Sequence, residues 1–154
     1  MLTDVIDVWV FRRGPDGVRY CLLYTSQEKA DRWFGGGRFW QIPGAFLEKD
    51  ETVVAAAGRC LRELGFSVSA LWVVEHVYPI YNRRTGGLML IPVFAAEVGH
   101  TGEMRLGWEH SEATWCTGDE CRQRLTFRGL LEGLDWVRRY ITENEVPRPE
   151  FRLA

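Results

Sequence analysis

The stretch that most constrains how this chain can fold runs from Gly44 to Phe66 and reads GAFLEKDETVVAAAGRCLRELGF. Apolar side chains recur in it at helical spacing, at Val54, Ala57, Leu61 and Leu64. Such a stripe predicts an amphipathic helix that packs on a sheet. Asp50 and Glu51 favour the start of this helix because negative charge is stabilised near its free N–H groups, and Gly65 favours its end.

The opposite face of the predicted helix carries a second set of residues, Thr52, Ala56, Arg59 and Glu63. Residues four apart on a helix are neighbours, so we expect Arg59 and Glu63 to share one exposed rim. Cys60 falls between the two faces, and a half-buried cysteine usually behaves as a small hydrophobic side chain. The stretch therefore predicts an acidic loop that leads into a helix with a charged rim.

The composition favours a single domain over residues 1–154, because 46% of the residues are hydrophobic and can form one sizeable core. A net charge of −2 provides no positive field that would attract a nucleic acid polymer or an anionic membrane. No apolar run approaches the roughly 20 residues that a membrane-spanning helix needs. Four cysteines without paired zinc-type spacing or a secretory signal indicate reduced thiols and a cytoplasmic protein.

Alternating or continuous apolar runs predict several strands, at residues 5–11, 18–24, 39–42, 68–81, 88–98 and 113–116. The first two predict a hairpin across the turn that contains Gly14 and Gly17. Residues 26–38 are polar and then glycine-rich, which predicts a flexible loop at the mouth of a site. Pro79 and Pro92 lack a backbone donor, so we expect bulges or sheet edges near them.

Two helices are predicted near the C-terminus. Thr117 followed by Glu120 forms a capping-box pattern for a brief helix. Thr126 is the expected cap of the last helix, whose apolar face would be Phe127, Leu130, Leu134, Val137 and Ile141. Residues 146–154 are predicted to form an extended tail along the surface. An α/β fold with a mixed sheet between the two long helices is the economical arrangement.

The loop and helix at residues 44–66 resemble the signature box of the Nudix hydrolases. That pattern is G, five residues, E, seven residues, then R-E-U-x-E-E-x-G-U, in which U is aliphatic. Glu51 falls on the first glutamate of the pattern, and Arg59 follows after seven intervening residues. Glu63 matches a later glutamate, and Glu48 falls on a common acidic position of the loop.

The box is degenerate at several positions. Ala45 stands where the pattern has its first glycine, with Gly44 just before it. Cys60 replaces the first helical glutamate, and Leu64 replaces the last one. The closing Gly65 arrives one residue early. Only one of the three helical glutamates is therefore retained.

Two short segments outside the box extend the resemblance to about residues 4–142. Residues 39–41 (FWQ) and 108–110 (WEH) look similar to the branch that cleaves dATP or dihydroneopterin triphosphate. The resemblance implies a Nudix-like α/β/α sandwich. It also implies that Arg59 pairs with Glu51 in a role that is more structural than chemical.

The resemblance implies attack of water on a diphosphate linkage, assisted by Mg²⁺ or Mn²⁺. The substrate class it implies is a nucleoside triphosphate or a related nucleoside diphosphate derivative. Glu63 would be the helical metal ligand, joined by the Ala45 carbonyl and by a glutamate ahead of the last strand, Glu109 first and Glu112 second. Mg²⁺ prefers hard oxygen ligands, which a thiol at Cys60 cannot supply.

Alternatives remain open at the sequence level. On spacing alone, Glu48, Asp50 and Glu51 are ordinary acids that stabilise a helix start. The loss of two box glutamates is also typical of a non-catalytic Nudix-fold module that binds a nucleotide or a partner protein. The sequence also leaves open whether the protein forms a homodimer. Four aromatic residues could stack on a base or pterin, namely Tyr78, Tyr81, Trp33 and Trp40. Aromatic residues in strands usually belong to the core, however.

Overall fold

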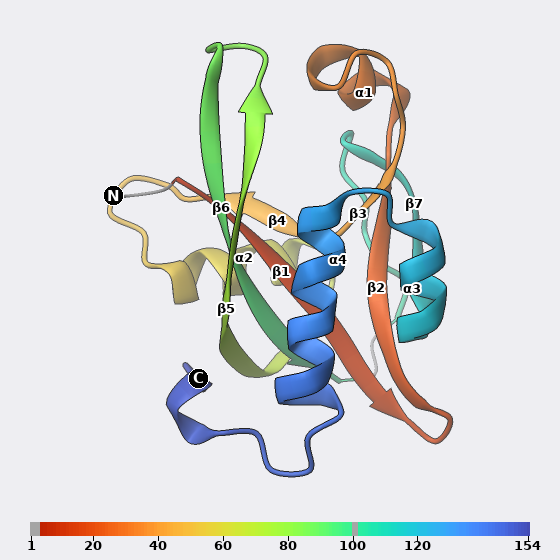
Figure 1. Ribbon diagram of the computed structural model, residues 1–154, viewed down its shortest axis with the longest axis vertical. Coiled ribbons are helices and arrows are strands. Elements are labelled where there is room, and N and C mark those ends of the chain that lie inside the picture. Colours follow the sequence, from red (N-terminus) through yellow and green to blue (C-terminus); the bar gives the residue numbers. More distant parts are fainter. Residues whose placement is uncertain (1–3, 100–101) are drawn as a thin grey trace.

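The computed structural model describes residues 4–99 and 102–154. The strands run in chain order as β1 (Val5–Gly14), β2 (Gly17–Thr25), β3 (Trp40–Gln41), β4 (Gly44–Phe46), β5 (Val68–Asn82), β6 (Gly87–Val98) and β7 (His110–Cys116). The helices are α1 (Gln27–Trp33), α2 (Val53–Glu63), α3 (Gly118–Arg124) and α4 (Arg128–Val137), which continues as a π-helical turn, Arg138–Thr142. A 3₁₀ turn, Pro149–Phe151, follows near the C-terminus (Figure 1).

Within the described residues, the strands form one mixed seven-stranded sheet. Five strands lie in the order β3-β2-β1-β6-β5, with β4 added to β1 and β7 added to β2. β1 runs parallel to β6, and the other pairs are antiparallel. Residues 5–7 of β1 pair with β4, whereas residues 11–14 pair with β2. β4 and β2 therefore share the edge of β1 opposite β6, and the box loop follows β4 at this edge.

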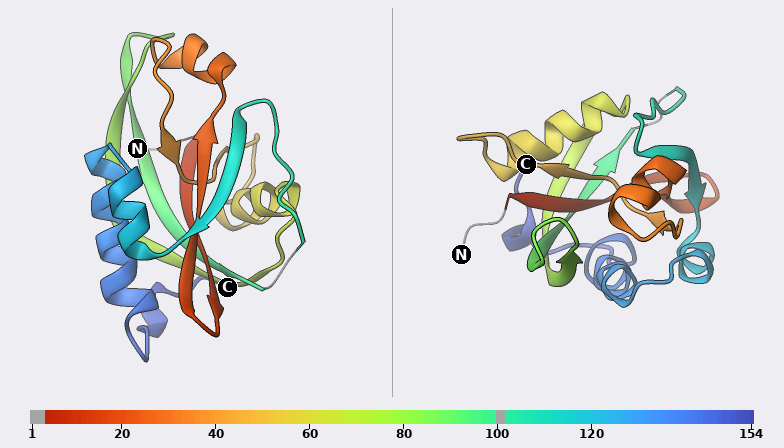
Figure 2. Two further views of the ribbon diagram at one scale, coloured as in Figure 1. Left: turned by 90° about the vertical axis from the view of Figure 1, so that its right-hand side faces the viewer. Right: turned by 90° about the horizontal axis from the view of Figure 1, so that it is seen from above.

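Helices cover both faces of the sheet, with α2 on one side and α3 and α4 on the other (Figure 2). The core on the α4 side includes Trp9, Phe11 and Leu134, all fully buried. The core on the α2 side includes Val8 and Leu61. Successive β1 residues alternate between the two cores, as the period of a strand requires. The predicted α/β/α sandwich is confirmed.

The box helix begins later than predicted, and its buried face is shifted from the predicted stripe, although Ala57 and Leu61 are buried as predicted. Thr52 is its N-cap, and the Thr52 side chain accepts a hydrogen bond from the Ala55 N–H. The acids expected in the first turn lie ahead of the helix instead. The buried face consists of Ala56, Ala57, Cys60 and Leu61. Ala56, predicted to be exposed, is fully buried, and Val54, predicted to be buried, is exposed, because the two adjacent alanines form the part of the helix nearest the sheet.

The stretch predicted to be a flexible loop contains helix α1. The Ser26 side chain caps this helix by accepting a hydrogen bond from the Lys29 N–H. The predicted cap of the last helix was also wrong, because Phe127 occupies the N-cap position of α4 without a side-chain hydrogen bond. Phe127 is half exposed, so the buried face of α4 starts at Leu130. The capping box of α3 formed by Thr117 and Glu120 is present as predicted.

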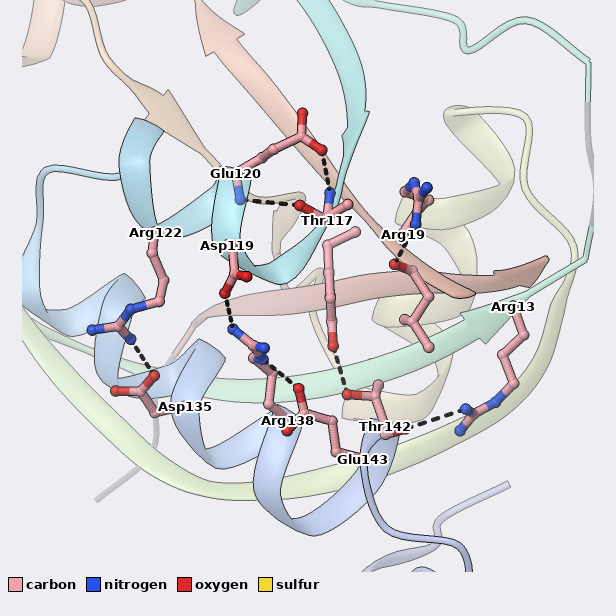
Figure 3. Close-up of polar contacts among 12 residues, drawn as sticks. Arg13, Arg19, Thr117, Asp119, Glu120, Arg122, Asp135, Arg138, Thr142 and Glu143 are labelled. Atoms are coloured by element: carbon pink, nitrogen blue, oxygen red, sulfur yellow. Dashed lines mark hydrogen bonds and ion pairs between the residues drawn. The ribbon is translucent and has the colours of Figure 1, made fainter. Parts of the chain in front are cut away.

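A polar network fastens α3 to the end of α4 (Figure 3). Arg138 donates hydrogen bonds to Glu143 at 2.6 Å and to Asp119 at 3.2 Å. The Tyr20 hydroxyl and the Thr142 side chain form a buried hydrogen bond of 2.5 Å nearby. The charges of this region are therefore paired with one another.

The C-terminal segment is not simply an extended tail along the surface. Arg152 forms an isolated antiparallel β-bridge with Trp72, and the N–H of Leu153 donates to the Leu71 carbonyl at 2.7 Å. The last residues thus cover part of the outer edge of β5. In the described part of the chain, no helix has the length and apolar character needed to cross a membrane.

Candidate active site

Arg59 joins the loop ahead of α2 to the helix itself. Its guanidinium donates two hydrogen bonds to the Glu51 carboxylate, from Nε to Oε2 and from Nη2 to Oε1, both at 2.9 Å. Nη2 also donates to the Phe46 carbonyl at 2.7 Å, and the Glu48 N–H donates to Glu51 Oε1 at 3.0 Å. The hydrogen bonds from Arg59 are the main reason why the pKa of Glu51 is lowered to about 2. A bidentate pair of this kind fixes the course of the loop.

The same guanidinium faces two further carboxylates. Arg59 Nε lies 3.7 Å from Glu48 Oε1, and Arg59 Nη1 lies 3.7 Å from Glu63 Oε1. The Glu63 side chain is 69% exposed on the rim of α2. Glu63 is therefore available to a ligand while Arg59 restrains its position.

Gly44 of β4 lies close against β1, where it pairs with Asp7. A Cβ atom at this position would lie 2.5 Å from Asp7 Oδ1 and 2.7 Å from the Ile6 carbonyl oxygen, so the site requires glycine. The Gly44 carbonyl accepts a hydrogen bond from the Cys60 thiol at 3.2 Å. Burial raises the pKa of the Cys60 thiol to about 12, and the negative charge of Glu63 adds a smaller effect in the same direction. Cys60 is thus a protonated donor at neutral pH rather than a thiolate.

A pocket of about 300 Å³ opens beside this rim. It is lined by Gly44, Cys60 and Glu63 from the box and by the segment that precedes β7, including Arg105, Trp108 and Glu109. Glu63 and Glu109 are 46 positions apart in the sequence, yet they line one cavity. The Arg105 guanidinium adds a positively charged side chain to the lining of this pocket. Its Nη2 donates to the Arg62 carbonyl at 3.3 Å.

Glu109 is held by α1. The Lys29 ammonium lies 3.4 Å from Glu109 Oε1, and the Ser26 N–H donates to the Glu109 carbonyl at 2.8 Å. Gln41 Oε1 is 2.8 Å from both Lys29 Nζ and His110 Nε2. Because this amide oxygen accepts both bonds, His110 carries its proton on Nε2. Burial, with a smaller effect of the Lys29 charge, lowers the pKa of His110 to about 3, so the imidazole is neutral.

A further carboxylate, that of Asp7 on β1, lies next to Gly44. The Tyr78 hydroxyl donates a short hydrogen bond to Asp7 Oδ2. Burial raises the pKa of Asp7 to about 6, against the opposing effects of the Tyr78 hydrogen bond and the Lys29 charge. Asp7 is adjacent to Gly44 in the β1–β4 pairing, so this acidic group contacts the start of the box.

The comparisons with known proteins agree with this geometry. The family model described as NUDIX domain matches residues 2–137 of the chain. The chain belongs to the Nudix family. This membership makes it a Nudix-type hydrolase, as the sequence resemblance predicted. No match was found among the curated proteins.

Several solved Nudix structures share the fold of this Nudix protein. A protein from Listeria monocytogenes assigned to the Nudix hydrolases is 16% identical, with a TM-score of 0.75 and coverage of 96% of this chain and 99% of that one. The C. elegans Ap4A hydrolase is 14% identical, with a TM-score of 0.70 and coverage of 93% and 100%. The E. coli dihydroneopterin triphosphate pyrophosphohydrolase is 13% identical, with a TM-score of 0.64 and coverage of 91% and 95%.

The remaining residues predicted for the Nudix site lie outside the pocket. Ala45 of β4 pairs with Ile6 of β1, and the cavity is lined by Gly44 rather than by Ala45. Glu48 is 70% exposed on the loop. Glu112 is exposed on β7 opposite Tyr24 and does not line the pocket, in contrast to Glu109.

The donors at the Nudix pocket are hard oxygen groups, namely the carboxylates of Glu63 and Glu109 and the carbonyl of Gly44. Mg²⁺ in proteins often uses one or two carboxylates, with water and substrate phosphate completing its octahedral shell. The described residues contain no group of three or more His, Cys, Asp or Glu side chains placed to hold a metal. The donor set therefore fits one hard cation shared with substrate phosphate, rather than a metal caged by protein ligands alone.

Sequence reasoning missed three groups at this site. Lys29 lies in a stretch predicted to be a loop, and only the helix α1 brings its ammonium to Glu109. Asp7 interrupts an apolar strand, which was a visible signal, but its contact with Tyr78 depends on pairing across β6. Arg105 lies in an irregular segment without any pattern that would predict its place in the pocket.

Proposed function

We propose that the protein is a divalent-metal-dependent pyrophosphohydrolase that cleaves a diphosphate linkage in a nucleoside triphosphate or a related nucleoside diphosphate derivative. The observation that carries this proposal is the pocket in which Glu63 of the box and Glu109 of a distant segment lie with Arg105. Two carboxylates suit a hard cation, and a guanidinium suits a phosphate. Family membership supplies the reaction class.

Each group has a distinct role in this proposal. Glu63 and Glu109 would hold Mg²⁺ or Mn²⁺, which supplies charge neutralisation for the phosphates and a more acidic bound water. Arg105 would bind phosphate oxygens. Arg59 positions Glu63 and the box loop, and Lys29 restrains the Glu109 carboxylate through their ion pair.

The names of two fold relatives support the substrate class. One relative is a hydrolase of Ap4A, and the other is a pyrophosphohydrolase of dihydroneopterin triphosphate. Both compounds carry a planar ring system joined to a chain of phosphates. These two compounds therefore belong in the first set of substrates to be tested, together with the common nucleoside triphosphates.

A non-catalytic module that binds nucleotides is the second candidate. The observation that favours it is the replacement of two box glutamates by Cys60 and Leu64. The Cys60 thiol donates to the Gly44 carbonyl and is protonated, so it offers no metal ligand in their place. The two candidates differ in whether phosphate is released.

The direct test is a phosphate-release screen over nucleoside triphosphates, dinucleoside polyphosphates, nucleotide sugars and dihydroneopterin triphosphate. Each substrate is assayed with Mg²⁺, with Mn²⁺ and with EDTA. We expect turnover of at least one substrate that is lost in EDTA. Nucleotide binding without turnover of any substrate would favour the non-catalytic module.

Glu63→Gln tests the assignment of the helical carboxylate. We expect turnover to fall by about 100-fold or more, because a carboxamide is a poor ligand for a hard cation. The melting temperature should change little, since Glu63 is exposed. Glu48→Gln is the matched control, because Glu48 lies equally close to Arg59 but outside the pocket. Equal activity of the two variants would remove Glu63 from the metal site.

A further inference from the structure

Trp108 lines the candidate pocket but has no role in holding the metal or the box loop. The residue is 46% exposed and lies in the irregular segment between β6 and β7. A single exposed apolar residue on a protein surface is ordinary. An indole that lines the same cavity as Glu63 and Glu109 is more informative, because it adds an aromatic surface to a polar site.

Two side chains of α1 orient the Trp108 ring. The Trp33 ring meets it at 61°, with centroids 5.7 Å apart, and the Arg32 guanidinium carbon lies 4.7 Å from its centroid. Arg32 is itself held by Glu28, with a distance of 2.9 Å from Nη2 to Oε1. The indole is therefore preorganised, which reduces the entropic cost of placing a ligand against it.

We propose that Trp108 is a specificity-determining residue, on which a planar heteroaromatic ring of the substrate stacks. This inference rests on the proposed function and assigns recognition of the substrate's ring to one residue. Trp108 and Glu109 are adjacent in the chain and line one pocket, so a ring on Trp108 brings its attached phosphates toward Glu109 and Arg105. Base-to-aromatic stacking is tolerant of base identity, because every base has a π-face.

A purely structural role for Trp108 makes a different prediction. If the indole only joins α1 to the segment ahead of β7, its loss would lower stability and weaken all ligands alike. A stacking role affects only ligands that contain a ring. The deciding quantity is thus the ratio of affinities for two ligands with the same phosphate chain, one with a ring and one without.

The experiment measures the dissociation constants of ATP and inorganic tripolyphosphate by calorimetry in the presence of Ca²⁺. The wild-type protein should bind ATP more tightly than tripolyphosphate. Trp108→Ala should weaken ATP binding by about 5- to 100-fold and tripolyphosphate binding by less than about twofold. Trp108→Phe keeps an aromatic face and should retain most of the preference for ATP. Tyr140→Ala is the control for loss of an exposed aromatic residue outside the pocket and should match the wild type.

The outcomes separate this inference from the proposed function. Loss of the ATP preference in Trp108→Ala supports the stacking role even if the wild-type protein releases no phosphate in the substrate screen. An unchanged ratio of the two dissociation constants in Trp108→Ala, or a wild-type protein without preference for ATP, overturns the stacking role even if hydrolysis is observed. A variant that only melts at a lower temperature, with the ratio intact, assigns Trp108 to structure.

Discussion

Asp7 is the residue whose protonation couples the candidate site to stability. Burial raises the pKa of its carboxyl from 3.8 to about 6. An acid that is harder to ionise in the folded protein contributes stability below its unfolded pKa, and this contribution is lost as the pH rises through the folded pKa. Lowering the pH from 7.5 to 4.5 should therefore relieve the cost of the buried charge. The groups that face Asp7 and oppose the shift are the Tyr78 hydroxyl and the Lys29 ammonium.

Asp7→Asn tests this coupling. The amide oxygen can still accept the Tyr78 hydrogen bond, but the side chain no longer titrates. We expect the variant to be more stable than the wild type at pH 7.5, by on the order of 2 kcal/mol after allowance for residual solvent contact. The difference should shrink as the pH falls to 4.5, measured by thermal or urea unfolding at both values. A gap that is the same at both pH values would contradict the raised pKa.

At the residue scale, the sequence predicted what local spacing controls. The pairing of Arg59 with Glu51 follows from the spacing of the box, and it is present with both hydrogen bonds. The partners of Asp7 could not be predicted in this way. Its contact with Tyr78 joins β1 to β5, two strands that are separated in the sheet by β6. The order of strands is a property of the assembled sheet and is not encoded in either strand alone.

At the scale of elements, the box loop and α2 form one unit because Arg59 binds them together. Its guanidinium contacts the Glu51 carboxylate and the Phe46 carbonyl, and it faces Glu63. Because Arg59 lowers the pKa of Glu51 to about 2, Glu51 stays ionised and paired with Arg59 even at pH values where an ordinary glutamate is protonated. Its contribution to stability is lost only as the pH falls from about 4.5 toward 2.

Arg59→Ala should therefore loosen the loop and reduce activity together. We expect the melting temperature at pH 7 to fall by several degrees and turnover to decrease, because Glu63 loses its restraint. Arg59→Lys should recover only part of both, since an ammonium cannot reproduce the bidentate fork. Arg62→Ala is the control, as it removes a nearby exposed arginine of the same helix. Equal melting temperatures for Arg59→Ala and Arg62→Ala would count against the pairing.

Helix α1 shows where element prediction from sequence ends. Its seven residues bury only Lys29 and Ala30, so the sequence lacks the apolar periodicity that identified α2. A helix this short depends on its Ser26 cap and on tertiary contacts rather than on intrinsic propensity. The same limit explains the start of α4, where Phe127 instead of Thr126 is the cap. Packing around Phe39, whose ring lies 4.7 Å from Phe127, favours that boundary.

At the scale of the whole molecule, the pocket exists because distant segments meet beside the edge of β1 that β4 and β2 share. The box approaches β1 through β4, while the segment ahead of β7 reaches the same place through pairing of β7 with β2. The sequence predicted both segments and the sandwich that contains them. The pocket itself depends on how the β1–β4, β1–β2 and β2–β7 pairings position these segments. Occupancy of this pocket is therefore coupled to the stability of the entire fold.

Cys60→Glu tests that coupling by restoring a carboxylate one helical turn before Glu63. Cys60 is 8% exposed and donates to the Gly44 carbonyl, so a charge there should lower the melting temperature in EDTA. Two carboxylates three residues apart can converge on one hard cation. Mg²⁺ should then raise the melting temperature of the variant more than that of the wild type. At 100 times its dissociation constant, Mg²⁺ would add about 2.7 kcal/mol to the free energy of unfolding of the variant.

Cys60→Ser is the matched control, because serine keeps a donor for the Gly44 carbonyl without adding a charge. If metal binding limits the wild-type enzyme, Cys60→Glu should also lower the Mg²⁺ concentration that gives half-maximal phosphate release, whereas Cys60→Ser should not. The two readouts are independent, since one reports binding and the other turnover. A folded Cys60→Glu protein that gains neither Mg²⁺-dependent stability nor phosphate release would mean that Glu63 and position 60 do not face a common metal. The non-catalytic reading of the degenerate box would then be the better one.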